Sequence, residues 1–249
     1  MRLNGLLIAF LFSFFFIIFS AGNLLAQDNI SDTAFYQKAL VNASAVYHQS
    51  FGSQSALYNG NKYSQYPYKF KGGHQFFHSI EPVIGAVVYD GIRYDSILMQ
   101  YDEISDVLVI LGPRNWIQLL NGRVERFNLY NSNFVWLEKD SMRNTLDRTG
   151  FYNVLYTGQT SLLKKQIKLS REEISSNLEV LHFADEKDHY YIVQHNTYYP
   201  VKRKKDLYKI FGDQKKAVQR FVKTNHLNFR KNREAMLTAA TAYYDNLKK

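Results

Sequence analysis

The densest set of side chains that could bind a ligand is a run of four adjacent cations, Lys202, Arg203, Lys204 and Lys205. Residues 202–249 carry 14 Lys and Arg against 4 Asp and Glu, a net charge of +10, whereas residues 27–201 carry a net charge of −2. Four adjacent charges cannot all leave water, so we expect this basic cluster to be exposed. It predicts contact with an anionic envelope surface or an acidic polymer; the alternative is a solvated run that adds only solubility.

A second group of reactive side chains lies between Val88 and Asp106, where three Tyr-Asp pairs recur. The carboxylates are those of Asp90, Asp95, Asp102, Glu103 and Asp106. Calcium takes about six to eight oxygen ligands, which a carboxylate-rich loop could supply in part. The spacing matches no EF-hand and no nonapeptide calcium repeat, and Asp90 precedes Gly91 as in a turn. We therefore expect turns and strand edges here instead of a metal site.

Other catalytic signals are weak. His74 and His78 have the spacing of helical zinc ligands, but Gly72-Gly73 before them and Pro82 after them indicate a loop. The chain has no HExxH motif, no G-x-S-x-G elbow, no phosphate-binding glycine loop and no cysteine. The sequence thus predicts no catalytic residue, no cofactor and no metal. An enzyme is the less favoured class, with a hydrolase that uses Asp and His at strand ends as its form.

The first 26 residues have the layout of a secretory signal peptide. Arg2 precedes an uncharged run of 14 residues, Leu6 to Phe19, and small and polar residues follow up to Ala26. That run is shorter than the ~20 residues that span a bilayer as a helix, although an uncleaved anchor is the alternative. We expect a signal peptide at 1–26 and a single exported domain at 27–249. The expected location is periplasmic or extracellular, with peripheral association with the envelope as an alternative. No transmembrane span is expected after cleavage, and no nucleic acid partner.

The pattern of the exported part favours a sheet between residues 83 and 202. Its 19 tyrosines suit half-buried pleated surfaces, and short apolar runs alternate with turns. Asn121-Gly122 predicts a two-residue hairpin. The connections are too short for parallel crossovers, so we expect an antiparallel meander of about eight to eleven strands, strongly curved or closed into a barrel. The candidate strands are 83–90, 92–101, 106–111, 116–120, 124–130, 134–137, 151–157, 161–169, 178–183, 190–194 and 198–201.

Helical periodicity flanks this sheet. The segment from Ser31 to Gln49 predicts an N-terminal helix, followed by an irregular stretch to residue 82. After residue 202, one helix is capped by Asp213 and a second repeats apolar residues from Met236 to Leu247. The expected fold is α+β, with the divisions 27–82, 83–202 and 203–249, the last being a basic helical tail.

Several stretches resemble a group of uncharacterised exported proteins of Gram-negative bacteria. The matching stretches are Leu57-Tyr58-Asn59-Gly60 with Tyr63, Gly85 to Asp102 with its YDGIRY centre, Gly150 to Gly158 leading to Lys164-Lys165, and Leu207 to Phe229. The resemblance implies an exported single unit and assigns no activity.

Taken together, the sequence favours an exported binding or envelope-associated structural protein that is not an enzyme. A carrier that holds a lipid or other apolar ligand in a curved sheet is the further alternative. A cleft of Asp and His, an apolar cavity or a filled core on the inner face of the sheet would distinguish these classes.

Overall fold

A computed structural model describes residues 56–140 and 146–248. Contacts divide the chain into two units, residues 1–50 and 51–249, and all described residues belong to the second. The predicted signal peptide and the predicted helix Ser31–Gln49 lie outside the described residues. The expected irregular stretch before residue 82 contains a short 3₁₀ helix, Ala56–Tyr58, and two short strands that join the main sheet.

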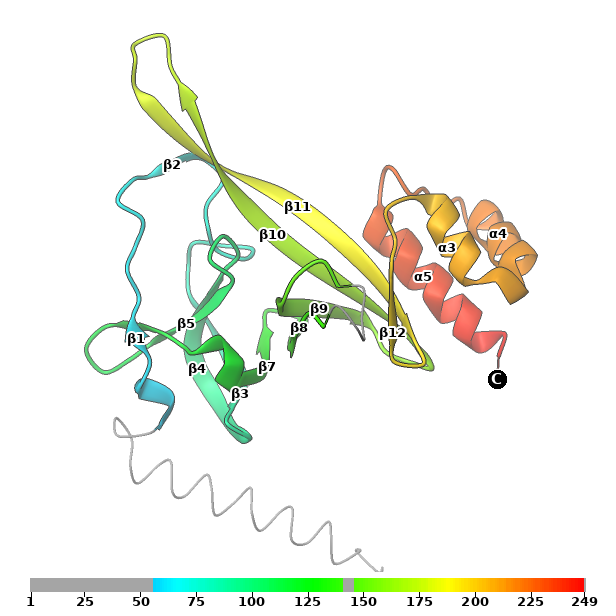
Figure 1. Cartoon of the computed structure of the whole chain (residues 1–249), viewed down its shortest axis with the longest axis horizontal. Coiled ribbons are helices and arrows are strands. Elements are labelled where there is room, and N and C mark those ends of the chain that lie inside the picture. Colours follow the sequence, from blue (N-terminus) through cyan, green and yellow to red (C-terminus); the bar gives the residue numbers. More distant parts are fainter. Residues whose placement is uncertain (1–55, 141–145, 249) are drawn as a thin grey trace, which may run out of the picture. The chain divides into compact units, whose positions relative to one another are not determined.

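The described chain forms one open sheet of twelve strands (Figure 1). Its order is β1-β6-β5-β4-β3-β7-β8-β9-β10-β11-β12, with β2 paired to β11. Every pair is antiparallel except the β2–β11 pair. The antiparallel sheet predicted from the sequence is therefore confirmed. The strands are β1 Asn61–Lys62, β2 Phe70–Gly72, β3 Val83–Tyr89, β4 Ile92–Asp102, β5 Val107–Leu111, β6 Trp116–Gln118, β7 Val124–Leu129, β8 Ser132–Leu137, β9 Gly150–Tyr156, β10 Thr160–Ile174, β11 Val180–Gln194 and β12 Thr197–Pro200.

The hairpin predicted at Asn121-Gly122 is wrong. β6 pairs with β5 and β1, and β7 crosses back to pair with β3, so the meander is interrupted between β6 and β7. Residues Asn121–Arg123 form a 3₁₀ turn, and the Asn121 amide donates a 2.8 Å hydrogen bond to the Asp106 carbonyl. This long-range bond ties the turn to the β4–β5 connection, a constraint that local turn propensity does not contain.

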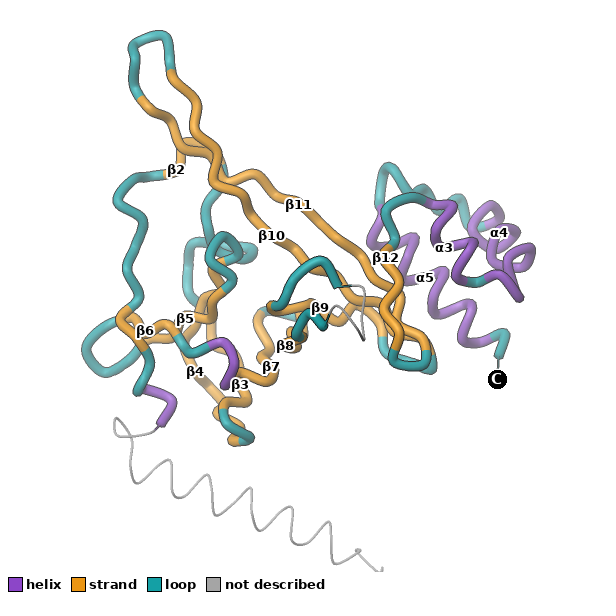
Figure 2. Tube along the Cα trace, in the orientation of Figure 1, coloured by secondary structure: helices purple, strands orange, loops and turns teal. Residues whose placement is uncertain are grey.

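The predicted strands 178–183 and 190–194 belong to one continuous strand, β11, which begins at Val180 because residues 178–179 lie in the preceding turn. All fifteen residues of β11 pair with β10, from Ile174↔Val180 to Thr160↔Gln194. The sequence predicted a break at residues Ala184 to His189, because these mostly polar residues give neither face of the strand an apolar pattern. Backbone pairing with β10 nevertheless continues through them and produces the long twisted hairpin seen in Figures 1 and 2.

Three helices follow β12, where the sequence predicted two: α3 Lys204–Ile210, α4 Lys215–Thr224 and α5 Arg233–Asn246. α3 was missed because seven residues give only one buried side chain, Leu207, and no visible periodicity. The predicted apolar faces of α4 and α5 are confirmed by the buried Val218 and Met236. Together the helices pack on a cluster that includes Leu162 of β10 and Ile192 of β11.

Candidate anion-binding groove

The basic cluster lies where β12 ends and α3 begins. Lys202 and Arg203 form the turn, and Lys204 and Lys205 start the helix. The Asp206 carboxylate accepts hydrogen bonds from the backbone N–H groups of Lys202 (3.1 Å) and Arg203 (2.7 Å). These bonds fix the turn while all four basic side chains remain exposed. The exposure expected from the sequence is thus found, although half of the cluster is helical.

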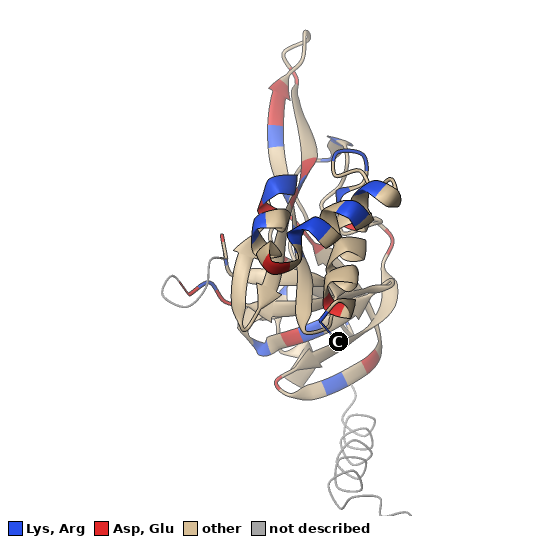
Figure 3. Ribbon diagram, turned by 90° about the vertical axis from the view of Figure 1, so that its right-hand side faces the viewer, with Lys and Arg blue, Asp and Glu red and all other residues tan. Residues whose placement is uncertain are grey.

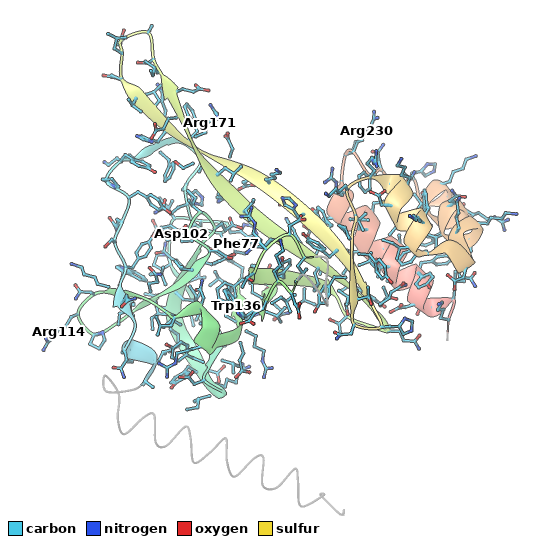
Figure 4. All side chains as sticks on the ribbon, viewed as in Figure 1. Phe77, Asp102, Arg114, Trp136, Arg171 and Arg230 are labelled. Carbon is cyan, nitrogen blue, oxygen red and sulfur yellow. The ribbon has the colours of Figure 1, made fainter. Side chains whose placement is uncertain are left out.

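A second basic segment, the connection from α4 to α5, faces this cluster. Asn228 Oδ1 accepts hydrogen bonds from the N–H groups of Arg230 (2.9 Å) and Lys231 (3.1 Å). Asn232 Oδ1 caps α5 by accepting from the Ala235 N–H at 3.0 Å. Two asparagines therefore set the backbone of this connection, on which Arg230 projects outward (Figure 4).

The two segments line a groove of about 600 Å³. We call it the basic groove; its lining residues are Lys202, Arg203, Lys204, Lys205, Leu227, Asn228, Phe229, Arg230 and Arg233. Figure 3 shows lysines and arginines gathered on the helices and on their connections. Sequence reasoning identified the first four cations but missed the two arginines. The available signal was the pair of arginines three residues apart directly after Phe229.

Arg233 is the most constrained cation of the groove. Its guanidinium carbon lies 4.8 Å from the centre of the Phe229 ring and 5.7 Å from the centre of the Tyr190 ring. Both distances are within the range of cation–π attraction. The two rings hold the half-buried side chain in place, so an anion that binds there does not have to immobilise it.

The cations of the basic groove have no carboxylate partners among the described residues. Some exposed arginines elsewhere in the described chain are paired, as Arg93 is with Asp95 at 2.7 Å and Arg123 is with Asp90. The carboxylate of Asp206, next to the basic cluster in the sequence, accepts hydrogen bonds from backbone N–H groups instead of pairing with these side chains. The six positive charges of the groove are therefore available to an external anion.

The carboxylates of the Val88–Asp106 region are engaged within the protein. Asp102 is fully buried and accepts hydrogen bonds from the hydroxyls of Tyr63 (2.8 Å) and Ser105 (2.7 Å). Asp106 accepts a 2.6 Å bond from the Tyr101 hydroxyl and pairs with Lys165 Nζ at 2.7 Å. Burial, reinforced by the charge of Asp102, raises the pKa of Tyr63 well above its usual value. The sequence predicted that these carboxylates lie in turns and at strand edges. Two of them, Asp102 and Asp106, also form buried polar pairs, which the sequence did not indicate.

Adjacent lysines of β10 serve two different carboxylate groups. Lys164 Nζ lies 3.2 Å from Asp188 and 3.1 Å from Glu234 of α5, and so connects the sheet to the helices. Lys165 turns to the opposite side, where its side chain is only 2% exposed beside Asp106. Gly150 adjoins this pair; a Cβ there would meet Asp106 and lie 2.6 Å from Lys165 Nζ, so glycine makes room for the ion pair.

A further buried ion pair joins Lys168 and Glu103, whose nearest atoms are 3.2 Å apart. Lys168 also donates a 2.6 Å hydrogen bond to the Phe76 carbonyl. Burial raises the pKa of Glu103 to about 7, while Lys168 opposes the increase. These contacts attach the segment around Phe76 to the sheet, which is a structural role.

The described residues supply little for catalysis. His189 Nδ1 lies 3.1 Å from Asp147, a carboxylate–histidine pair of the kind expected for a hydrolase. The other ring nitrogen, Nε2, has no hydrogen-bond partner among the described residues, so these residues do not place a nucleophile there. Nor do any three His, Asp or Glu side chains of the described chain lie where they could hold one metal ion.

Aromatic rings fill the packed side of the central sheet. Tyr101, Phe127, Phe134 and Phe151 contact one another with ring centres 4.6 to 5.8 Å apart, and all four are buried. Such packing leaves protein side chains where a carrier would hold its apolar ligand. The packed side of the central sheet is therefore a filled core.

No known protein family matches the chain, and no curated protein or solved structure proves similar to it. Within the described residues, no helix has the length and apolar character needed to cross a membrane.

Proposed function

We propose that this protein is an exported binding protein, not an enzyme, and that its basic groove takes an anionic partner. The observation that carries the proposal is the convergence of six cations without carboxylate partners on one groove, from two segments that are distant in the sequence. Export is supported by the N-terminal pattern of Arg2, the 14-residue uncharged run and the small residues up to Ala26.

The shape of the groove favours an acidic chain over a flat bilayer. Leu227 and Phe229 contribute half-buried apolar side chains to a lining that also holds six cations. A chain that carries carboxylates and apolar groups can enter such a concave site, whereas a bilayer surface meets only the rim. Exposed charges attract over about 10 Å at 0.1 M salt, so binding is expected to be salt-sensitive.

Binding of poly-glutamate, with and without substitutions in the groove, tests this function. The groove variant carries Gln at Lys202, Arg203, Lys204 and Lys205. We expect the protein to bind poly-glutamate at low salt, and the groove variant to lose at least about tenfold in affinity, or ~1.4 kcal/mol. A fourfold control variant removes the same charge from α4 by placing Gln at the exposed positions Lys215, Lys216, Arg220 and Lys223.

The control separates a site from general attraction. It is expected to keep most of the affinity of the unaltered protein. Equal losses in the two variants, or binding that 0.5 M salt leaves unchanged, would refute a specific groove. Vesicles with and without phosphatidylglycerol form a second arm: stronger binding to anionic vesicles than to poly-glutamate would assign the groove to a membrane surface and contradict the acidic chain.

A further inference from the structure

The hairpin of β10 and β11 ends in a well-defined turn. The Ser175 N–H donates to the Glu179 carbonyl at 2.9 Å, and the Leu178 N–H donates to the Ser175 carbonyl at 3.0 Å. Ser175 Oγ also accepts from the Glu179 N–H at 3.1 Å. We call residues 172–181 the hairpin tip. It extends beyond β2, the last element that pairs with β11 on this side (Figure 1).

The hairpin tip presents aliphatic side chains to water. Ile174, Leu178 and Val180 are 74%, 84% and 53% exposed. Leu178 also has a φ of 63°, in the left-handed region that is unfavourable for a residue with a side chain. Neither the exposure nor the backbone strain of Leu178 helps folding, and such outliers occur at binding sites. The tip thus has the features of a docking element.

The charge of the hairpin tip is negative. It contains Glu172, Glu173 and Glu179 and no Lys or Arg. Arg171 lies just before it (Figure 4), where it pairs with Asp185 and Glu173. Glu172 lies 3.5 Å from the His182 ring, so Glu179 is the tip carboxylate with no ion-pair partner among the described residues. The tip therefore combines a free carboxylate with aliphatic side chains, and the basic groove combines cations with the apolar side chains of Leu227 and Phe229. The two surfaces are complementary in charge and in apolar character.

The tip and the groove of one chain cannot meet. Arg233 of the groove lies over Tyr190, and Tyr190 pairs with Lys164 in the β10–β11 ladder. Ten residues of continuous strand separate Lys164 from Ile174 at the tip, a distance of about 33 Å at about 3.3 Å per residue. Contact within one molecule would require this ladder to break.

We propose that the basic groove of one copy binds the hairpin tip of a second copy. This inference rests on the proposed function, since it names the anionic partner of the same groove. Glu179 of the tip meets the cations of the groove, and Leu178 packs against Phe229 and Leu227. A hairpin tip covers little area, so the association is weak and transient. Because the contact joins two different surfaces, it builds rings or chains unless two copies exchange tips reciprocally.

Sedimentation of two complementary variants tests the inference. The tip variant carries Ile174→Thr, Leu178→Asn and Val180→Thr, which suit strands and a left-handed turn and so preserve folding. The groove variant is the fourfold Gln variant defined above. The average mass of the unaltered protein is expected to rise with concentration at low salt, while each variant alone stays monomeric. A 1:1 mixture is expected to associate, since the tip variant retains a groove and the groove variant retains a tip.

A separate control for the tip is Ile84→Ser, which removes an aliphatic side chain that is 70% exposed and lies outside the tip. It is expected to associate as the unaltered protein does. Self-association of the tip variant, or a mixture that stays monomeric, would overturn the inference.

Binding of poly-glutamate distinguishes a failure of this inference from a failure of the proposed function. If the tip variant binds poly-glutamate but the unaltered protein stays monomeric, the hairpin tip of a second copy is refuted as the partner, and the anion-binding groove is retained. A groove variant that still binds poly-glutamate refutes the groove itself.

Discussion

The ion pair of Lys165 and Asp106 allows a quantitative test of the structure. Lys165 Nζ is 2.7 Å from Asp106 Oδ2, and its side chain is 2% exposed. The same carboxylate accepts the Tyr101 hydroxyl at 2.6 Å. The substitution Asp106→Ala leaves a buried ammonium without its counter-charge, and leaves a buried hydroxyl without its acceptor.

Removing one partner of a buried pair typically costs about 3 to 5 kcal/mol. We expect this range for Asp106→Ala at neutral pH. Burial already lowers the pKa of Lys165, against the attraction of Asp106, so the lysine of the variant deprotonates more readily. Adding Lys165→Met removes the uncompensated charge and retains most of the volume. The double variant is therefore expected to recover about 2 kcal/mol or more relative to Asp106→Ala, as coupled neighbours do.

Urea unfolding of the two single variants and the double variant measures this coupling. Asp95→Ala is the control, since the Arg93–Asp95 pair is 61% exposed on both sides and is expected to contribute less than about 1 kcal/mol. Additive effects of the two substitutions, or a loss for Asp106→Ala no larger than for Asp95→Ala, would show that Lys165 is not buried beside Asp106.

Two further predictions concern Glu103 and export. The folded-state pKa of Glu103, about 7, lies above its usual 4.5, so its contribution to stability is full below pH 4.5 and declines by about 3 kcal/mol as the pH rises to 7. Glu103→Gln is expected to lack this decline. Its free energy of unfolding, measured in urea, therefore increases relative to that of the unaltered protein between pH 4.5 and 7.5. A difference in this free energy that does not depend on pH would contradict the burial of an ionisable group. For export, intact mass in a periplasmic or extracellular fraction is expected to match residues 27–249, whereas full-length protein held in the inner membrane would refute cleavage.

Local sequence signals predicted the sheet better than its connections. Asp90-Gly91 between two apolar runs marks a real turn, with φ values of 52° and 76° that fit this residue pair. Asn121-Gly122 carries the same signal, yet hydrogen bonds to distant strands override it. The long β11 was hidden for a related reason: its polar middle has no apolar face, and its pairing depends on β10 instead of on its own pattern.

The buried ion pairs were beyond sequence reasoning because they join residues far apart in the chain. Lys165 and Asp106 are 59 positions apart, and Lys168 contacts the Phe76 carbonyl across 92. Most charged residues of folded proteins lie on the surface, and these lysines are exceptions. A strand whose two faces both meet protein can bury lysines only where carboxylates from other elements reach them, and that depends on the pairing order of the sheet.

The basic groove shows how a local pattern and the fold combine into a candidate site. Adjacent charges must be exposed, so the sequence was sufficient to place Lys202 to Lys205 on the surface. It could not show that Arg230 and Arg233 face them, because this depends on how α5 packs against β10. A linear cluster in water would attract anions of any shape. In the groove, Arg233 is held over two aromatic rings, and this fixed charge is the reason we propose a specific acidic partner instead of solubility alone.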